Sequence, residues 1–123
     1  MLNFRHFLAT VLSFILLATA SNASAHTKFL SSKPAANAAA PSPSEITLTF
    51  DNAPTPVVAT LKDATGKDVA ALGSVRPDGT MLHYPLTRTL SPGQYTLSYR
   101  VTSSDAHVTT GTLTFTVTDG SAK

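Results

Sequence analysis

The chain has 123 residues, which is enough for one small domain and too few for a second domain or a large substrate cleft. Nine Lys and Arg side chains stand against seven Asp and Glu, a formal net charge of +2, and no basic run with interleaved aromatic residues occurs. This pattern argues against nucleic acid as a partner. The chain has no cysteine, so disulfides and thiolate metal ligands are excluded.

Residues 1–25 have the order of a secretory signal peptide. Arg5 supplies a positive charge, residues 7–20 are a mainly apolar stretch, and small residues follow. The apolar stretch is shorter than the roughly 20 residues that a membrane-spanning helix needs, so we expect a cleaved signal helix and not an anchor. Three positions satisfy the small-x-small cleavage rule: after Ala20, after Ala23 and after Ala25.

The export signal divides the chain into three parts. We expect a signal peptide at 1–25, one mature domain at 26–119 and a short tail at 120–123. The mature protein is then secreted, which in bacteria means the periplasm.

The mature chain is dominated by Thr, Ser, Val, Leu, Pro and Gly after residue 44, which favours an all-β fold. The first half of the mature chain is expected to form a strand at 27–32, a Pro-rich loop at 33–44 and a strand at 45–50. Strands at 57–61 and 67–72 follow, joined by a hairpin turn at 63–66. After a turn at 76–79 we expect a strand at 81–84 and two long final strands. About seven short strands separated by turns predict an Ig-like Greek-key β-sandwich or barrel.

Strict alternation of apolar and polar residues is clearest in three of these strands. The inward-facing sets are Ile46, Leu48 and Phe50, then Tyr95, Leu97, Tyr99 and Val101, then Leu113, Phe115 and Val117. The segment from Leu90 to Tyr95 also fits a tyrosine corner, in which a Tyr hydroxyl binds backbone upstream, or a simple turn before a strand.

One histidine of the mature chain has a carboxylate two positions before it. That pair is Asp105 and His107. In extended backbone, residues two apart point to the same face, so both side chains can reach one ion. An imidazole and a carboxylate suit Cu(II), although an Asp-x-His pair by itself is more often a solvated turn.

Cleavage after Ala25 would make His26 the first residue. A terminal His offers its α-amine and its imidazole Nδ1 to a single metal ion, and the amine has an ordinary pKa near 7.7–8.0, low enough for a Lewis-acidic ion to displace its proton. His83 and Met81 share one strand face and suggest a second, softer site, but such residues are more often surface and core residues. No catalytic group emerges, since Ser103 and Ser104 cannot form a nucleophile–base–orienter set with their loop neighbours.

Four segments of the mature chain resemble the CopC-like periplasmic copper-binding proteins. They are residues 26–34, which open with His-Thr-Lys-Phe and end in Ser-x-Pro, residues 46–50, residues 90–107, which end in Ser-x-Asp-x-His, and residues 111–117. The resemblance implies a Greek-key barrel or sandwich and a Cu(II) site made by the amine and imidazole of His26 with Asp105 and His107. It also implies one ion per chain, copper carriage or buffering in homeostasis or resistance, and an inner-membrane recipient of the CopD type. We expect a monomer.

The chain departs from the family pattern at several positions. Met1 and Met81 are its two methionines, so we expect Cu(II) alone and no methionine-rich Cu(I) loop. An auxiliary acidic contact from Asp51 or Asn52 stays open. Tyr99 stands where Trp is common, and Ala106 and Val108 stand where Gly and Pro are usual.

Two other functions compete with a copper carrier. A terminal His with a second His also resembles the histidine brace of oxidative polysaccharide-cleaving enzymes, although Asp105 would hinder copper reduction. The sandwich is also compatible with a metal-free interaction module, which cleavage after Ala20 or Ala23 would favour. We expect a binding protein and not an enzyme.

Overall fold

The computed structural model describes residues 27–119 as eight β-strands. The predictions for the signal peptide, for His26 and for the tail at 120–123 concern residues outside this range. The strands are β1 (Phe29–Lys33), β2 (Ala39–Ala40), β3 (Glu45–Phe50), β4 (Thr55–Asp63), β5 (Arg76–Asp78), β6 (Met81–Pro85), β7 (Gly93–Thr102) and β8 (Val108–Val117). Within the described range, no helix is long and apolar enough to cross a membrane.

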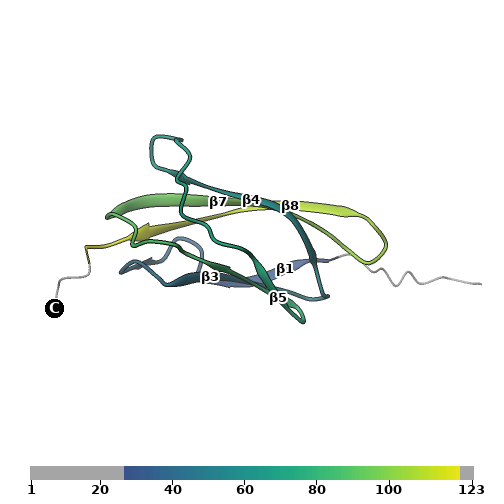
Figure 1. The fold of residues 1–123 in the computed structure, drawn as a ribbon. Coiled ribbons are helices and arrows are strands. Elements are labelled where there is room, and N and C mark those ends of the chain that lie inside the picture. Colours follow the sequence, from purple (N-terminus) through teal and green to yellow (C-terminus); the bar gives the residue numbers. More distant parts are fainter. Residues whose placement is uncertain (1–26, 120–123) are drawn as a thin grey trace, which may run out of the picture.

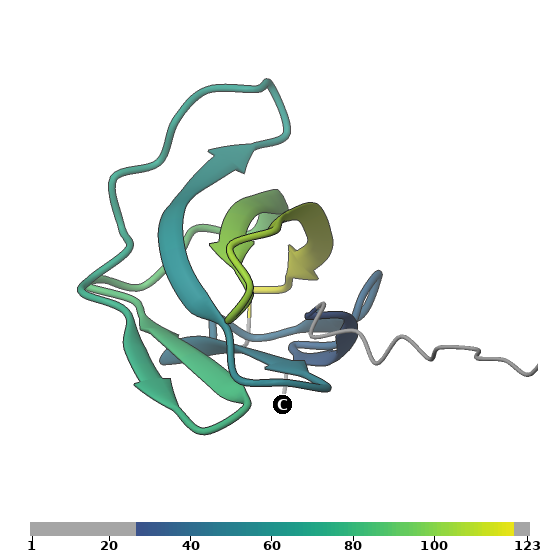
Figure 2. The ribbon, with the colours of Figure 1, turned by 90° about the vertical axis from the view of Figure 1, so that its right-hand side faces the viewer.

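The strands form two four-stranded sheets that pack face to face, as Figures 1 and 2 show. One sheet has the order β1-β3-β6-β5 and the other β2-β8-β7-β4. The chain changes sheet at every connection from β1 to β5 and again between β6 and β7, so sequential strands often lie in different layers. The predicted all-β sandwich is therefore confirmed, with one strand more than expected.

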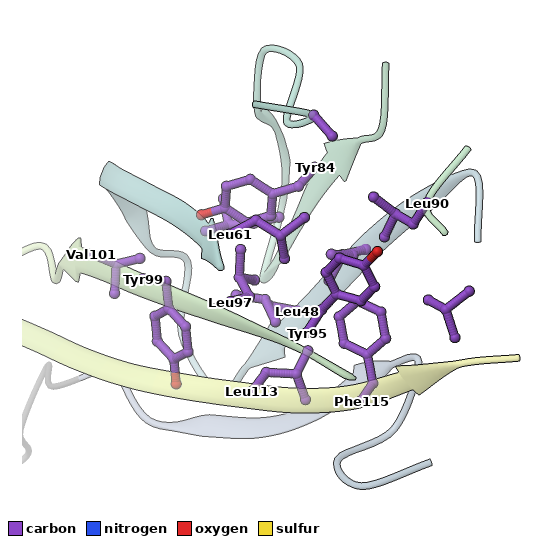
Figure 3. Packing of buried hydrophobic residues seen from close by; sticks show 14 of the residues in the cluster. Leu48, Leu61, Tyr84, Leu90, Tyr95, Leu97, Tyr99, Val101, Leu113 and Phe115 are labelled. Atoms are coloured by element: carbon purple, nitrogen blue, oxygen red, sulfur yellow. The ribbon is translucent and has the colours of Figure 1, made fainter. Parts of the chain in front are cut away.

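The core is built from the alternating sets that the sequence indicates. Ile46, Leu48 and Phe50 of β3 are buried against the inward faces of β7 and β8. Figure 3 shows core side chains such as Leu48, Leu97 and Leu113 meeting between the layers, with Tyr95 beside Phe115 at one end and Tyr99 at the other. Burial of this apolar surface is the main favourable contribution to folding.

Three predicted segments differ from the structure. The loop at 33–44 contains the two-residue strand β2, which pairs in parallel with the end of β8. The expected turn at 76–79 is the short strand β5 followed by a turn at Gly79, which has a φ of 61°. The expected strand at 67–72 makes only isolated bridges, because the hydrogen bonds from Asp63 N to Lys67 O and from Val69 N to Leu61 O keep it as an irregular return beside β4.

An aromatic cluster of Phe29, Phe50 and Tyr99 fastens the beginning of β1 to both sheets. The Phe29 ring centroid lies 6.0 Å from that of Phe50 and 6.1 Å from that of Tyr99. Gly111 of β8 makes room for this cluster, since a Cβ there would lie 2.5 Å from Cζ of Tyr99. The chain just before Phe29 is thereby directed to the end of the sandwich where β7 turns into β8.

The tyrosine corner is confirmed. The Tyr95 hydroxyl donates a hydrogen bond to the backbone oxygen of Ser91 at 2.7 Å. It ties the start of β7 to the connection that brings the chain over from β6.

Tyr84 and Tyr95, two of the three buried tyrosines, make a matched test of this corner. The Tyr84 hydroxyl has no hydrogen-bond partner among the described residues, and burial raises the pKa of Tyr84 to about 12. We expect Tyr95→Phe to lower the free energy of unfolding by about 1 kcal/mol, whereas Tyr84→Phe leaves it unchanged or raises it, because only Tyr95 loses a hydrogen bond. Urea denaturation measures both, and equal losses would contradict the assignment.

Candidate metal centre

The loop at 103–107 is a tight hairpin connection between the two longest strands. The last ladder pair joins Thr102 of β7 to Val108 of β8. Ser103 N donates to His107 O at 2.9 Å, and Ala106 N donates to Ser103 O at 2.9 Å. These backbone bonds close the loop on itself at one end of the sandwich (Figure 1).

The structure brings Asp105 and His107 together, as the sequence predicts. Asp105 Oδ2 lies 2.9 Å from His107 Nδ1. The reason differs from the expected extended backbone, because the pair sits on a turn whose intervening residue, Ala106, has a left-handed φ of 71°. Both side chains remain accessible, with 62% of His107 and 38% of Asp105 exposed.

The charge of Asp105 is fixed by its neighbours. The Ser103 hydroxyl donates to Asp105 Oδ1, and the His107 side chain and backbone N–H lie against the same carboxylate. Chiefly through the Ser103 hydrogen bond and then that of His107, the pKa of Asp105 falls to about 2. The loop therefore presents a carboxylate anion beside an imidazole at neutral pH.

The beginning of the described chain lies beside this loop. The Thr109 hydroxyl donates to the backbone oxygen of Thr27 at 3.2 Å, which joins the residue after His26 to the residue two places after His107. On its other side, Lys28 N donates to Asp51 Oδ1 at 2.7 Å, and Asp51 N donates to Lys28 O at 2.9 Å. Thr27 itself is only 3% exposed.

The donor set of the loop fits a copper ion in chemistry but is incomplete by itself. Within residues 27–119 no three His, Cys, Asp or Glu side chains come together as a group able to hold a metal ion. Asp105 and His107 supply one oxygen and one nitrogen, the donor types that tetragonal Cu(II) prefers. A four-coordinate ion needs two further donors. His26, which lies outside the described range, directly precedes Thr27 in the chain.

Comparison with known proteins shows the family of the chain. The family model described as the CopC domain matches residues 29–118. The chain belongs to the CopC family. It is 31% identical over 126 residues to the copper resistance protein C of Xanthomonas campestris pv. juglandis, covering 95% of this chain and 99% of that protein.

Two crystal structures are similar to this chain in fold as well as in sequence. The CopC of Methylosinus trichosporium OB3b is 27% identical and gives a TM-score of 0.69, covering 80% of this chain and 99% of that one. PcoC, a methionine-rich copper resistance protein from Escherichia coli, is 32% identical with a TM-score of 0.65, covering 76% of this chain and 99% of that one.

The sequence analysis missed the contacts of two residues at this end of the sandwich. Ser103 binds the Asp105 carboxylate, and Thr109 binds the chain start. Asp51, whose contact with a metal was left open, binds the backbone of Lys28. The spacing of Ser103 in Ser-x-Asp-x-His was visible, but its role depends on the turn. No pattern in the sequence links Thr109 to Thr27, which lie 82 residues apart.

The structure gives no support to a second site at His83 and Met81. His83 Nδ1 lies 2.9 Å from Glu45 Oε2, and His83 Nε2 lies 3.5 Å from Asp78 Oδ2. The ring therefore bridges β3 and β5 on the outer face of its sheet, with both nitrogens beside carboxylates. These contacts link β6 to its two neighbouring strands.

Glu45 gives this bridge a pH dependence. The hydrogen bond with His83 is the main cause that lowers the pKa of Glu45 below its ordinary value of 4.5. A lowered carboxylate pKa adds stability above the unfolded value, and that stability is lost as the pH falls through the folded value. We expect Glu45→Gln to have a lower free energy of unfolding than the parent at pH 7, measured by urea titration. The difference between the two proteins should shrink below pH 4.5. A difference that does not change with pH would contradict this account.

Ala106 tests the turn that brings the pair together. A left-handed φ raises the energy of an L-residue by about 1 kcal/mol, whereas glycine adopts it without this penalty. We expect Ala106→Gly to keep or raise the free energy of unfolding, and Ala106→Val to lower it by about 1–2 kcal/mol. Ser104→Gly on the same turn is the control and should lower it, because Ser104 has no positive φ. Urea denaturation distinguishes these outcomes.

Proposed function

We propose that this CopC-family protein binds one Cu(II) ion in the periplasm through the α-amine and imidazole of His26 together with Asp105 and His107. The observation that carries the proposal is the hydrogen bond from the Thr109 hydroxyl to the backbone oxygen of Thr27. It brings the residue that follows His26 to the strand that begins directly after His107.

Covalent geometry limits how far His26 can be from that point. Its Cα is about 3.8 Å from the Cα of Thr27 in any conformation with a trans peptide. A His side chain and a free amine on such a short tether stay close to the contact between Thr27 and Thr109, on the strand that begins directly after His107. Tethering also lowers the entropic cost of assembling the ligands.

The chemistry of these donors selects the oxidation state. An amine, two imidazoles and a carboxylate are borderline to hard donors, which favour Cu(II), and Cu(II) is also the tightest divalent guest in the Irving–Williams order. Cu(I) prefers thiolate or thioether ligands. The chain has no cysteine and two methionines, Met1 and Met81, in contrast to the methionine-rich PcoC.

The exposure of the loop suits a protein that exchanges its ion. His107 is 62% exposed, so an acceptor can approach the metal without unfolding the loop. We propose that the protein carries or buffers copper in homeostasis and resistance, as a monomer, with a CopD-type inner-membrane protein as recipient. The names of its relatives, which are copper resistance proteins, support this role.

Binding is favoured over oxidative catalysis by Asp105. An anionic ligand stabilises Cu(II) relative to Cu(I) and therefore opposes the reduction that a histidine-brace enzyme requires. We expect the copper-loaded protein with ascorbate to make hydrogen peroxide no faster than the same protein without copper. Rapid peroxide production would favour the enzyme.

The free amine is the most specific element of the proposal. We expect protein beginning at His26 to bind one equivalent of copper with a nitrogen-rich tetragonal signal in electron paramagnetic resonance. Acetylation of the His26 α-amine removes this donor from the chelate and should weaken binding by at least tenfold in competition titrations. Equal affinity with and without the acetyl group would contradict the proposed site.

Two further measurements complete this test. Mass spectrometry of the exported protein should show His26 as its first residue, and cleavage after Ala20 or Ala23 would favour a metal-free module. Asp105→Ala should weaken binding, whereas Asp68→Ala, an exposed carboxylate paired with Lys62 at 2.6 Å, should leave it unchanged.

A further inference from the structure

We propose that Ser103 is a positioning residue of the copper centre, whose hydroxyl holds the Asp105 carboxylate in the orientation in which it binds the ion. This inference rests on the proposed function. Ser103 lies immediately after β7, and its side chain is directed into the loop where it meets both Asp105 and the backbone of His107.

The hydrogen bonds of the Ser103 hydroxyl are fully defined. Its hydrogen goes to Asp105 Oδ1, which is by far its shortest contact, and its oxygen accepts the His107 N–H at 3.2 Å. His107 O does not need the hydroxyl, because Ser103 N already donates to it at 2.9 Å. One hydroxyl thus connects the carboxylate to the backbone that carries the imidazole.

Burial makes this arrangement rigid. Ser103 is only 5% exposed, so water does not compete freely for its hydroxyl. With Oδ1 engaged by Ser103, Oδ2 is the oxygen that faces the His107 ring, at 2.9 Å from Nδ1. The carboxylate therefore presents one oxygen toward the imidazole before any ion arrives.

Removing the hydroxyl should release this constraint. Without the Ser103 hydroxyl, Asp105 Oδ1 keeps only the longer contact from the His107 N–H at 3.3 Å, so the Asp105 side chain gains rotational freedom, and ordering it becomes part of the cost of binding the ion. Partners that orient a metal ligand contribute about 10- to 100-fold to metal affinity. We expect Ser103→Ala to weaken Cu(II) binding by that factor.

The test compares three single variants in protein that begins at His26. Ser103→Thr keeps a hydroxyl and should bind Cu(II) with an affinity within about threefold of the parent. Ser103→Ala should bind Cu(II) about 10- to 100-fold more weakly. Ser104→Ala, on the same turn and exposed, is the matched control and should not differ from the parent. Affinities come from competition with a chelator, and thermal unfolding of the copper-free proteins confirms that each is folded.

A double-mutant cycle shows whether Ser103 acts through Asp105. In an Asp105→Ala background we expect Ser103→Ala to have no further effect on affinity, and we expect the Ser103→Ala copper signal in electron paramagnetic resonance to shift toward that of Asp105→Ala. A structural role alone would leave the signal of the bound ion as in the parent.

The outcomes separate this inference from the proposed function. Tight, nitrogen-rich copper binding by the parent together with unchanged affinity and signal in folded Ser103→Ala would overturn the role of Ser103 and leave the site intact. Tenfold weaker binding by folded Ser103→Thr would also overturn it, and this variant decides the matter should Ser103→Ala fail to fold. A parent that does not bind Cu(II) would overturn both proposals.

Discussion

The contact between the Thr109 hydroxyl and the Thr27 backbone oxygen is the constraint on which the proposed site depends. It joins Thr27, at the start of the described chain, to the beginning of β8, so that the described chain starts next to the strand that follows the loop at 103–107. The aromatic cluster around Phe29 and the hydrogen bonds between Lys28 and Asp51 support it from the core and from the neighbouring loop. A rigid β-sandwich thus supplies a site to which the described loop contributes two metal donors.

The loop at 103–107 combines an ionised carboxylate, that of Asp105, with a solvent-exposed imidazole, that of His107. Ser103 and His107 hold the Asp105 carboxylate ionised and oriented, while the His107 ring stays largely exposed. An ionised carboxylate beside an exposed imidazole is the arrangement that the proposed copper carrier or buffer needs, and it differs from the enclosed, reducible centre of an oxidative enzyme.

The sequence predicted most of the fold because strands that cover a core alternate strictly. The sets beginning at Ile46, Tyr95 and Leu113 are buried as expected. The segment at 67–72 was misassigned because its pattern does not reveal that its pairing is divided, with Asp68 bridging Lys62 of β4 and Leu72 bridging Leu86. Asp105 and His107 were found from their spacing, whereas Ser103 and Thr109 were missed, since their roles depend on the turn at Ala106 and on a contact between distant residues.

The central claim is that the chain start and the loop at 103–107 share one cupric ion. The most direct measurement is the paramagnetic broadening of backbone amide signals by substoichiometric Cu(II) in a nuclear magnetic resonance spectrum of protein beginning at His26. We predict that the signals of residues 27–28 and 103–109 disappear together and first, while those of β5 and β6 persist. Broadening centred on His83, or loss of the loop signals with those of residues 27–28 unaffected, would contradict the claim.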